Sequence, residues 1–238
     1  MCIWLFPVGC RITRILLLAS ATILCMRCIF LLRTHKLAVF AILAIGLIVL
    51  VWLCFPGRPG DPSVLKQSYI QSLKQYRGTL YVWGGENRIG IDCSGLVRRG
   101  LINANVRTGL LTLNPKLVRT ALVLWWNDCS ARALRDEYLG FTARLFQAES
   151  INSIASTTLL PGDLAVTSDG VHVLAYLGDK TWIEADPSVM KVITVLTPSD
   201  NVWFQAPVHI VRWNQLKEGL NIEKAYSRGE SEAGVRRQ

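Results

Sequence analysis

YVWGG at residues 81–85 and DCSG at residues 92–95 are the two short motifs that decide how this chain is interpreted. Paired glycines indicate a turn, and Asp92 is a residue type favoured at a helix N-cap. We therefore expect Cys93 to begin a helix that runs to about residue 103, where the unpaired N–H groups of the first turn favour an anion. Because cysteine attacks as a thiolate, this position suits a nucleophile. A lone cysteine is more often a small buried core residue, so the interpretation requires a base.

The base must come from His172 or His209, the two histidines that lie beyond the first 60 residues. His172 follows a turn dipeptide at residues 169–170 and begins an apolar strand, whereas His209 lies in the alternating stretch VHIVRW. As single features, both histidines are more often structural than catalytic. A catalytic histidine also needs a polar residue that orients its ring, and the strand that follows His172 contains two carboxylates.

The two candidates for this orienting residue are Glu184 and Asp186, in the stretch TWIEADP. Residues that face each other in an antiparallel hairpin have positions with a constant sum. A three-residue turn at 178–180 places Asp186 opposite His172, and a register slip of two residues places Glu184 there instead. Both carboxylates lie on the face of His172, so strand parity leaves the choice open.

The remaining pattern predicts one α+β domain at residues 63–215. Residues 63–76 and 115–148 have a helical pattern, and the character of the sequence changes after the turn at residues 160–163. Short β-rich runs follow, namely LAVT, VHVLAYL, TWIEA, KVITVL and VHIVRW. A helical half followed by a stranded half predicts N-terminal helices packed on an antiparallel sheet.

A membrane segment is predicted before this domain, because 51% of all residues are hydrophobic and the mean hydropathy is +0.31. Residues 37–55 carry no charge, are long enough to span a bilayer and follow a basic flank, so we expect a transmembrane anchor with the domain outside the cytoplasm. Residues 1–36 form a basic apolar segment, cytoplasmic or a second membrane helix, and residues 56–62 form a Pro/Gly linker. A lipidated Cys54 and a later start at Met26 remain open.

The charge distribution argues against nucleic acid as a partner. Residues 1–60 contain six basic and no acidic side chains, whereas residues 61–211 contain fourteen basic and thirteen acidic ones. The domain thus lacks the excess of Lys and Arg that phosphate binding needs. Its only cysteines are Cys93 and Cys129, which predicts neither a disulfide framework nor a metal site, and no cofactor is expected. The charged tail, residues 216–238, is expected to be loosely ordered.

YVWGG, DCSGL, LLPGDL and GVHVLAYLG together resemble the NlpC-type cell-wall peptidases, a papain-like group, over about residues 65–190. The resemblance implies that Cys93 is the nucleophile and that His172 is the base. It selects Glu184, twelve positions after His172, as the third residue. Tyr81 matches a family tyrosine near the cysteine, which would assist the Cys93 N–H in an oxyanion hole.

The same resemblance implies a hydrolase of peptidoglycan stem peptides in a bacterial inner membrane, with its domain on the periplasmic or extracellular side. The usual family bond lies between D-glutamate and a diamino acid, and the reaction would pass through a thioester. An acyltransferase or amidase acting on a lipid or another amide is the alternative, as is a non-catalytic wall-binding module. The bond cleaved and the oligomeric state are left open.

Two departures from the family pattern stand out. Many members carry a neutral polar third residue, whereas an ionised Glu184 would favour the imidazolium form of the base. The segment at about residues 105–156 is longer than a minimal member needs. Its side chains Trp125, Trp126, Asp128 and Cys129 either shape the substrate cleft or pack as helix core. We expect the two tryptophans to pack in the core, and Cys129 to be buried and inert.

Overall fold

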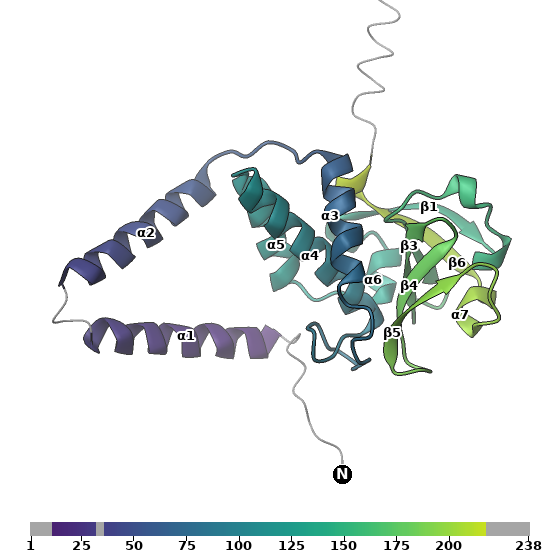
Figure 1. The fold of residues 1–238 in the computed structure, drawn as a ribbon, viewed down its shortest axis with the longest axis horizontal. Helices are drawn as coiled ribbons and strands as arrows, with labels where there is room; N and C mark the ends of the chain where they lie inside the picture. Colours follow the sequence, from purple (N-terminus) through teal and green to yellow (C-terminus); the bar gives the residue numbers. More distant parts are fainter. Residues whose placement is uncertain (1–10, 32–35, 218–238) are drawn as a thin grey trace, which may run out of the picture.

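The computed structural model describes residues 11–31 and 36–217, in which two helices precede a folded domain (Figure 1). The helices are α1 (Arg11–Leu31), α2 (Lys36–Cys54), α3 (Pro62–Lys74), α4 (Cys93–Leu111), α5 (Pro115–Trp126), α6 (Ala131–Arg135) and α7 (Val202–Gln205). The strands are β1 (Thr142–Ala148), β2 (Leu164–Thr167), β3 (Val173–Gly178), β4 (Thr181–Asp186), β5 (Lys191–Leu196) and β6 (Val208–Trp213). Nearly all of the predicted tail, and part of the predicted N-terminal segment, lie outside the described residues.

The strands form one sheet in the order β1-β6-β2-β3-β4-β5, in which every neighbouring pair is antiparallel. Helices α3, α4 and α5 precede all of these strands, and α4 packs between α3 and α5 and against β3 and β4. This arrangement confirms the predicted α+β fold with helices on an antiparallel sheet. Helix α4, which begins at Cys93, contacts β3 and β4, the two strands of the hairpin that follows His172.

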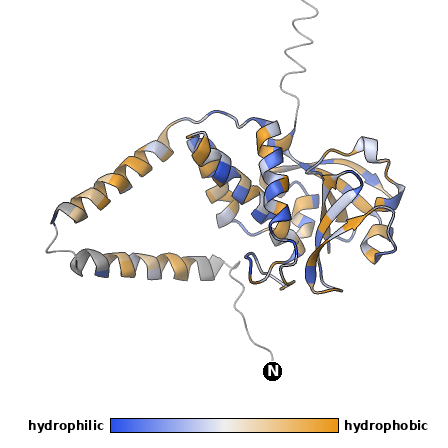
Figure 2. Cartoon of the chain, in the orientation of Figure 1, coloured by the Kyte–Doolittle hydropathy of each residue, from blue (hydrophilic) through white to orange (hydrophobic). Residues whose placement is uncertain are grey.

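The sheet is buried on both faces, which explains why its central strands are continuously apolar instead of alternating. Along β3, Val173 and Ala175 belong to the core shared with α3 and α4, whereas Leu174 and Tyr176 belong to a second core. The short helix α7 covers the second core with the fully buried Phe204. Figure 2 shows the apolar residues running along the strands and along α2.

The predicted helical pattern over residues 115–148 is wrong at its C-terminal end. Helix α5 ends at Trp126, α6 has only five residues, and residues 142–148 form the edge strand β1. Thr142 is buried and pairs with Trp213 of β6, while the outward side chains of the strand stay exposed. An edge strand with one exposed side has scattered apolar positions, and these also fit a helical period. Helix α4, in contrast, is longer than predicted.

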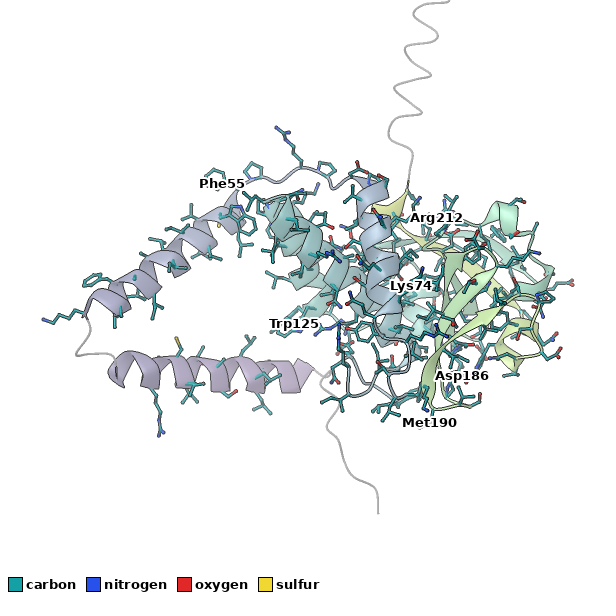
Figure 3. The ribbon with its side chains drawn as sticks, in the orientation of Figure 1. Phe55, Lys74, Trp125, Asp186, Met190 and Arg212 are labelled. Atoms are coloured by element: carbon teal, nitrogen blue, oxygen red, sulfur yellow. The ribbon has the colours of Figure 1, made fainter. Side chains whose placement is uncertain are left out.

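The LLPGDL motif joins two parts of the sheet. Asp163 is buried, and its two carboxylate oxygens accept hydrogen bonds from Arg212 on β6 at 2.5 and 2.7 Å. The same carboxylate caps the turn by accepting from the Leu160 N–H at 2.8 Å. Gly162 has a φ of +99°, a conformation that favours glycine. The motif therefore ties the turn before β2 to β6, far along the chain; Arg212 is labelled in Figure 3.

Two helices precede the domain. Helix α2 covers nearly the same residues as the predicted apolar run, and side chains along it, including Phe40, Leu47 and Ile48, are exposed. Among the residues that the structure describes, no helix is both long and apolar enough to cross a membrane.

The end of α2 and the predicted linker at residues 56–62 are both packed against the domain, the linker through a hydrogen bond from Asn114 Nδ2 to the Arg58 carbonyl oxygen at 2.8 Å. Arg119 of α5 donates hydrogen bonds to the carbonyl oxygens of Leu53 and Phe55, the latter at 2.7 Å. A Cβ on Gly57 would lie 2.4 Å from Asn114 Oδ1, so no larger residue fits there without movement. Figure 3 shows Phe55 at the end of α2, beside one end of α5. The chain between α2 and α3 is thus held close to α5.

Candidate active site

Cys93 is the first residue of α4, and Asp92 is its N-cap. One carboxylate oxygen of Asp92 accepts from the Gly95 N–H at 2.6 Å and from the Ser94 hydroxyl at 3.0 Å. The other oxygen accepts from the Gly84 N–H at 2.8 Å, so the same side chain holds the glycine turn against the helix. The two sequence motifs are therefore one structural unit, built around Asp92 and presenting Cys93 at a helix N-terminus.

Gly95 is required by this close approach. A Cβ at this position would lie 2.5 Å from the carbonyl oxygen of Gly85 and 3.0 Å from Asp92 Oδ1. We expect Gly95→Ala to lower the free energy of unfolding by about 2 kcal/mol, because backbone atoms of the turn would have to move. Urea denaturation measures this. Arg99→Ala, on the half-buried side of the same helix, should change the stability by about 0.5 kcal/mol or less. Equal stabilities for the two variants would contradict the packing argument.

The His172 ring is buried, with 2% of its surface exposed, and it is held on two sides. Its Nε2 lies 2.8 Å from Glu184 Oε2, on β4. The indole of Trp203 stacks on the imidazole with ring centroids 4.2 Å apart and an interplanar angle of 19°. The Cys93 thiol lies beside this ring: it contacts the carbonyl oxygen of Val171, the residue before His172, at 3.9 Å, and its charge acts on the imidazole. Because Nε2 is taken by Glu184, Nδ1 is the ring nitrogen that remains for the thiol.

The hairpin register explains why both Glu184 and Asp186 lie on the face of His172, where either one could orient its ring. The pairs Ala175–Ile183 and Tyr176–Trp182 have the predicted constant sum, but the predicted three-residue turn is wrong: Gly178 pairs with Thr181 across a two-residue turn, and the register shifts between Tyr176 and Gly178. Continued to the start of the hairpin, this register sets Asp186 opposite His172. The hydrogen bond nevertheless runs diagonally to Glu184, two positions along the same face. Asp186 instead accepts from the N–H and hydroxyl of Ser188 at 2.7 and 2.6 Å.

Asn201 joins the two carboxylates and is a residue that the sequence did not single out. Its side-chain N–H₂ donates to Glu184 Oε1 at 3.0 Å and to Asp186 Oδ2 at 3.1 Å. Its Oδ1 accepts from the Trp203 N–H at 3.0 Å, as the N-cap of α7. The signal in the sequence was only an Asn before a short apolar run, which predicts a cap. Nothing local indicated that this cap contacts β4 or covers His172.

The protonation states follow from burial and from these hydrogen bonds. Burial lowers the pKa of His172, but hydrogen bonds and charge interactions with Cys93 and Glu184 outweigh it and raise the pKa to about 9. Burial also raises the pKa of Glu184, against the opposing effect of His172. The pKa of Asp186 is lowered, because hydrogen bonds from Ser188 and Asn201 outweigh its burial. The site thus favours an imidazolium beside the thiol at neutral pH.

Cys93 opens into a cavity of about 470 Å³. Tyr81, Trp83 and Val171 line it together with Cys129 and its neighbours up to Arg132. Cys129 is half-buried in this wall, whereas the sequence predicted a fully buried residue. Trp125 packs against the core, as expected, but the same prediction is wrong for Trp126, whose side chain is exposed at the end of α5. The segment between α4 and β1 therefore contributes directly to the cavity.

Tyr81 is placed to act as a neutral hydrogen-bond donor. Its burial, with the nearby charges of Cys93 and Asp92, raises its pKa to about 12, so the phenol keeps its proton. We expect Tyr81→Phe to lower kcat by about 10²-fold, with little change in KM, if the hydroxyl donates to the developing oxyanion. Steady-state kinetics measure this. Tyr138→Phe, whose hydroxyl bonds to Asn127 O and lies outside the cavity lining, is the control. Equal kcat values for both variants would remove Tyr81 from this role.

His209, the other histidine considered, lies on β6 between Gln147 of β1 and Val166 of β2. It is not part of the cavity lining. The charges that act on His209 are those of Arg144, Arg135 and Asp136, whereas Cys93 acts on His172 and contacts the carbonyl oxygen of Val171 beside it, so His172 is the histidine that lies near Cys93. A group of three or more His, Cys, Asp or Glu side chains suited to a metal ion is absent from the described part of the chain.

An α+β fold in which a cysteine at a helix N-terminus meets a buried histidine–carboxylate pair on an antiparallel sheet is the architecture of papain-like thiol enzymes. The comparison with family models then specifies the group. Residues 78–212, more than half of the chain, match the NlpC/P60 family, and the chain belongs to this family. The predicted resemblance is confirmed.

Solved structures with low sequence identity share this family. The peptidoglycan hydrolase RipB from Mycobacterium tuberculosis is 18% identical, with 66% of this chain and 67% of that chain covered and a TM-score of 0.42. The NlpC/p60 domain of the peptidoglycan hydrolase SagA is 23% identical, with 61% of this chain and 97% of that chain covered and a TM-score of 0.37. NlpC2 from Trichomonas vaginalis is 18% identical, with 68% of this chain and 50% of that chain covered and a TM-score of 0.40. No curated protein matches the sequence.

Proposed function

We propose that this chain is a membrane-anchored cysteine hydrolase that cleaves amide bonds in peptidoglycan stem peptides. The observation that carries the proposal is the series Cys93, His172 and Glu184, in which His172 bonds to Glu184, its pKa is raised by the nearby Cys93, and Cys93 opens into the cavity. A buried carboxylate that orients an imidazole next to a thiol is the arrangement that nucleophilic acyl transfer requires. Family membership supports the cell wall as the source of the amide.

The reaction follows from the positions of these groups. The Cys93 thiolate attacks the amide carbonyl, and the new C–S bond forms a tetrahedral intermediate whose oxyanion accepts hydrogen bonds from the Cys93 N–H and Tyr81. The His172 imidazolium gives its proton to the nitrogen, the C–N bond breaks, and an amine leaves a thioester behind. Neutral His172 then takes a proton from water, which attacks the thioester and releases the acid and the thiol. Glu184 fixes the ring throughout.

The test is the digestion of purified peptidoglycan by the full-length protein in detergent. We expect new amine and carboxylate termini to appear in equal number. Cys93→Ala, at equal concentration, should release none. Mass spectrometry of the products separates hydrolysis from acyl transfer, because a transferase would attach the acyl group to an added amine. Identical, background-level release by both proteins would overturn the proposal.

Anchoring is the second part of the proposal, and it is supported by helix α2. The run at residues 37–55 has no charge and follows a basic flank. Apolar side chains around α2, such as Phe40, Leu43 and Ile48, are more than half exposed, and large exposed apolar surfaces call for an apolar partner such as lipid. Membrane fractionation tests it: we expect the protein to sediment with membranes after a carbonate wash. Recovery in the washed supernatant would contradict anchoring.

A further inference from the structure

One wall of the Cys93 cavity is formed by a segment to which the proposed mechanism assigns no role. This wall runs from Cys129 to Arg132, at the start of α6, and lines the same cavity as Tyr81 and Cys93. Arg132 is exposed and contributes the only cationic side chain among the described residues that line this cavity.

The base of the Arg132 side chain is fixed against the loop that leads to His172. A Cβ on Gly170 would lie 2.8 Å from the Arg132 Cβ and 3.0 Å from its Cα, so the two backbones are in close contact. Arg132 Nη2 also donates to the carbonyl oxygen of Asp169, with a length of 3.4 Å. This long bond leaves most of the guanidinium donors available to a ligand in the cavity.

The carboxylates near Arg132 have stronger partners than Arg132, whose charge makes the smallest of the contributions that lower the pKa of Asp136 and Asp169. Asp92, which also lines the cavity, accepts three hydrogen bonds within its own motif. Asp169 accepts from the Thr167 hydroxyl at 2.5 Å and from the Val171 N–H at 2.9 Å. Among the described residues, Arg132 forms no ion pair. The cavity thus presents a cation whose natural complement, a planar anion able to accept two N–H bonds, is a carboxylate.

We propose that Arg132 binds a free carboxylate of the substrate next to the scissile amide, and so selects acidic peptides over their amidated forms. The inference rests on the proposed function and specifies its substrate class. A dicarboxylic residue that is joined through one carboxyl group keeps the other one free, and Arg132 lines the same cavity as the thiol that would attack the joined one. Replacing that carboxylate by a carboxamide removes the charge but preserves the shape, and thus isolates the contribution of Arg132.

The experiment compares matched stem peptides in which each free carboxylate beside the scissile bond is replaced, in turn, by a carboxamide. For the full-length parent protein, we expect one replacement to lower kcat/KM by about 10- to 50-fold, the loss typical of one charged hydrogen-bonding pair. In Arg132→Gln, the acid and amide forms of that peptide should be cleaved at nearly equal rates. Arg132→Lys should retain part of the preference, because it keeps the charge but not the bidentate geometry.

The control is Arg135→Gln, in the same helix. Arg135 donates to Ser168 O and pairs with Asp136, so it holds the same loop without lining the cavity. It should keep the parent ratio of acid to amide cleavage. A ratio of rates within one variant cancels losses due to folding. An unchanged preference in Arg132→Gln, or no preference in the parent protein, would overturn the inference. No cleavage of any peptide by the parent protein would instead overturn the proposed function.

Discussion

Replacing Cys93 with alanine is expected to lower kcat/KM for stem-peptide hydrolysis by about 10⁴-fold or more, because covalent catalysis is lost together with the thiol. Cys93→Ser should be nearly as inactive, because a hydroxyl group is a much weaker acid than a thiol and does not form the anion that attacks the amide. Cys129→Ala should retain activity, because burial raises the pKa of the Cys129 thiol and keeps it protonated. Release of amine termini measures all three.

Alkylation provides an independent measurement on the same cysteines. A small haloacetamide probe at neutral pH should label Cys93 much faster than Cys129, because the thiolate is the reactive form. Peptide mapping after short exposure gives both rates in one sample. Labelling of Cys129 at an equal or higher rate would contradict the assignment of Cys93 as the nucleophile and would favour a non-catalytic role for the domain.

Glu184→Gln is expected to lower kcat/KM by about 10³-fold, in the middle of the range for groups that support general acid–base catalysis. Glutamine preserves the shape but removes the charge that stabilises the imidazolium, 2.8 Å away. The matched control is Asp186→Asn, which lies on the same strand and shares Asn201 with Glu184. It should cause a much smaller loss, because Asp186 bonds to Ser188 and not to His172. Equal losses would leave the third residue unassigned.

The pH dependence of kcat/KM distinguishes Glu184 from Asp186 by the position of its alkaline limb, whatever the size of the loss in kcat/KM. The imidazolium of His172 is lost as the pH rises through its pKa of about 9, so kcat/KM of the parent protein should fall there. Removing the negative charge of Glu184 disfavours the imidazolium, so this alkaline limb should move to lower pH in Glu184→Gln. Asp186→Asn should leave it in place. An alkaline limb that is the same in all three proteins would contradict the proposed pairing.

Much of the fold was predictable because the relevant signals are local. The stretches LAVT, TWIEA, KVITVL and VHIVRW all became strands, because β-rich residues lie between turn residues. The cap at Asp92 and the start of α4 at Cys93 also follow from short-range chemistry. Strand β1 was missed because an edge strand with one exposed face has no pattern that excludes a helix.

The candidate site was only partly predictable, because its last steps depend on contacts between distant segments. Parity placed Glu184 and Asp186 on one face, but a diagonal hydrogen bond decides between them, and only the three-dimensional geometry shows it. Asn201 and Trp203 come from a loop beyond β5, and no periodicity links that loop to His172. The resemblance to the family had selected Glu184 without these two residues.

The hydrogen bonds from Arg119 to the end of α2 have a consequence for the reach of the enzyme. With α2 in a bilayer, as proposed, a free linker would let the domain sample a deep shell of cell wall on a flexible tether. A segment that is packed on α5 would instead hold the domain close to the bilayer. It would thereby limit the distance between the Cys93 cavity and the lipid. Such an enzyme would reach only those substrate bonds that lie within a narrow range of distances from the bilayer.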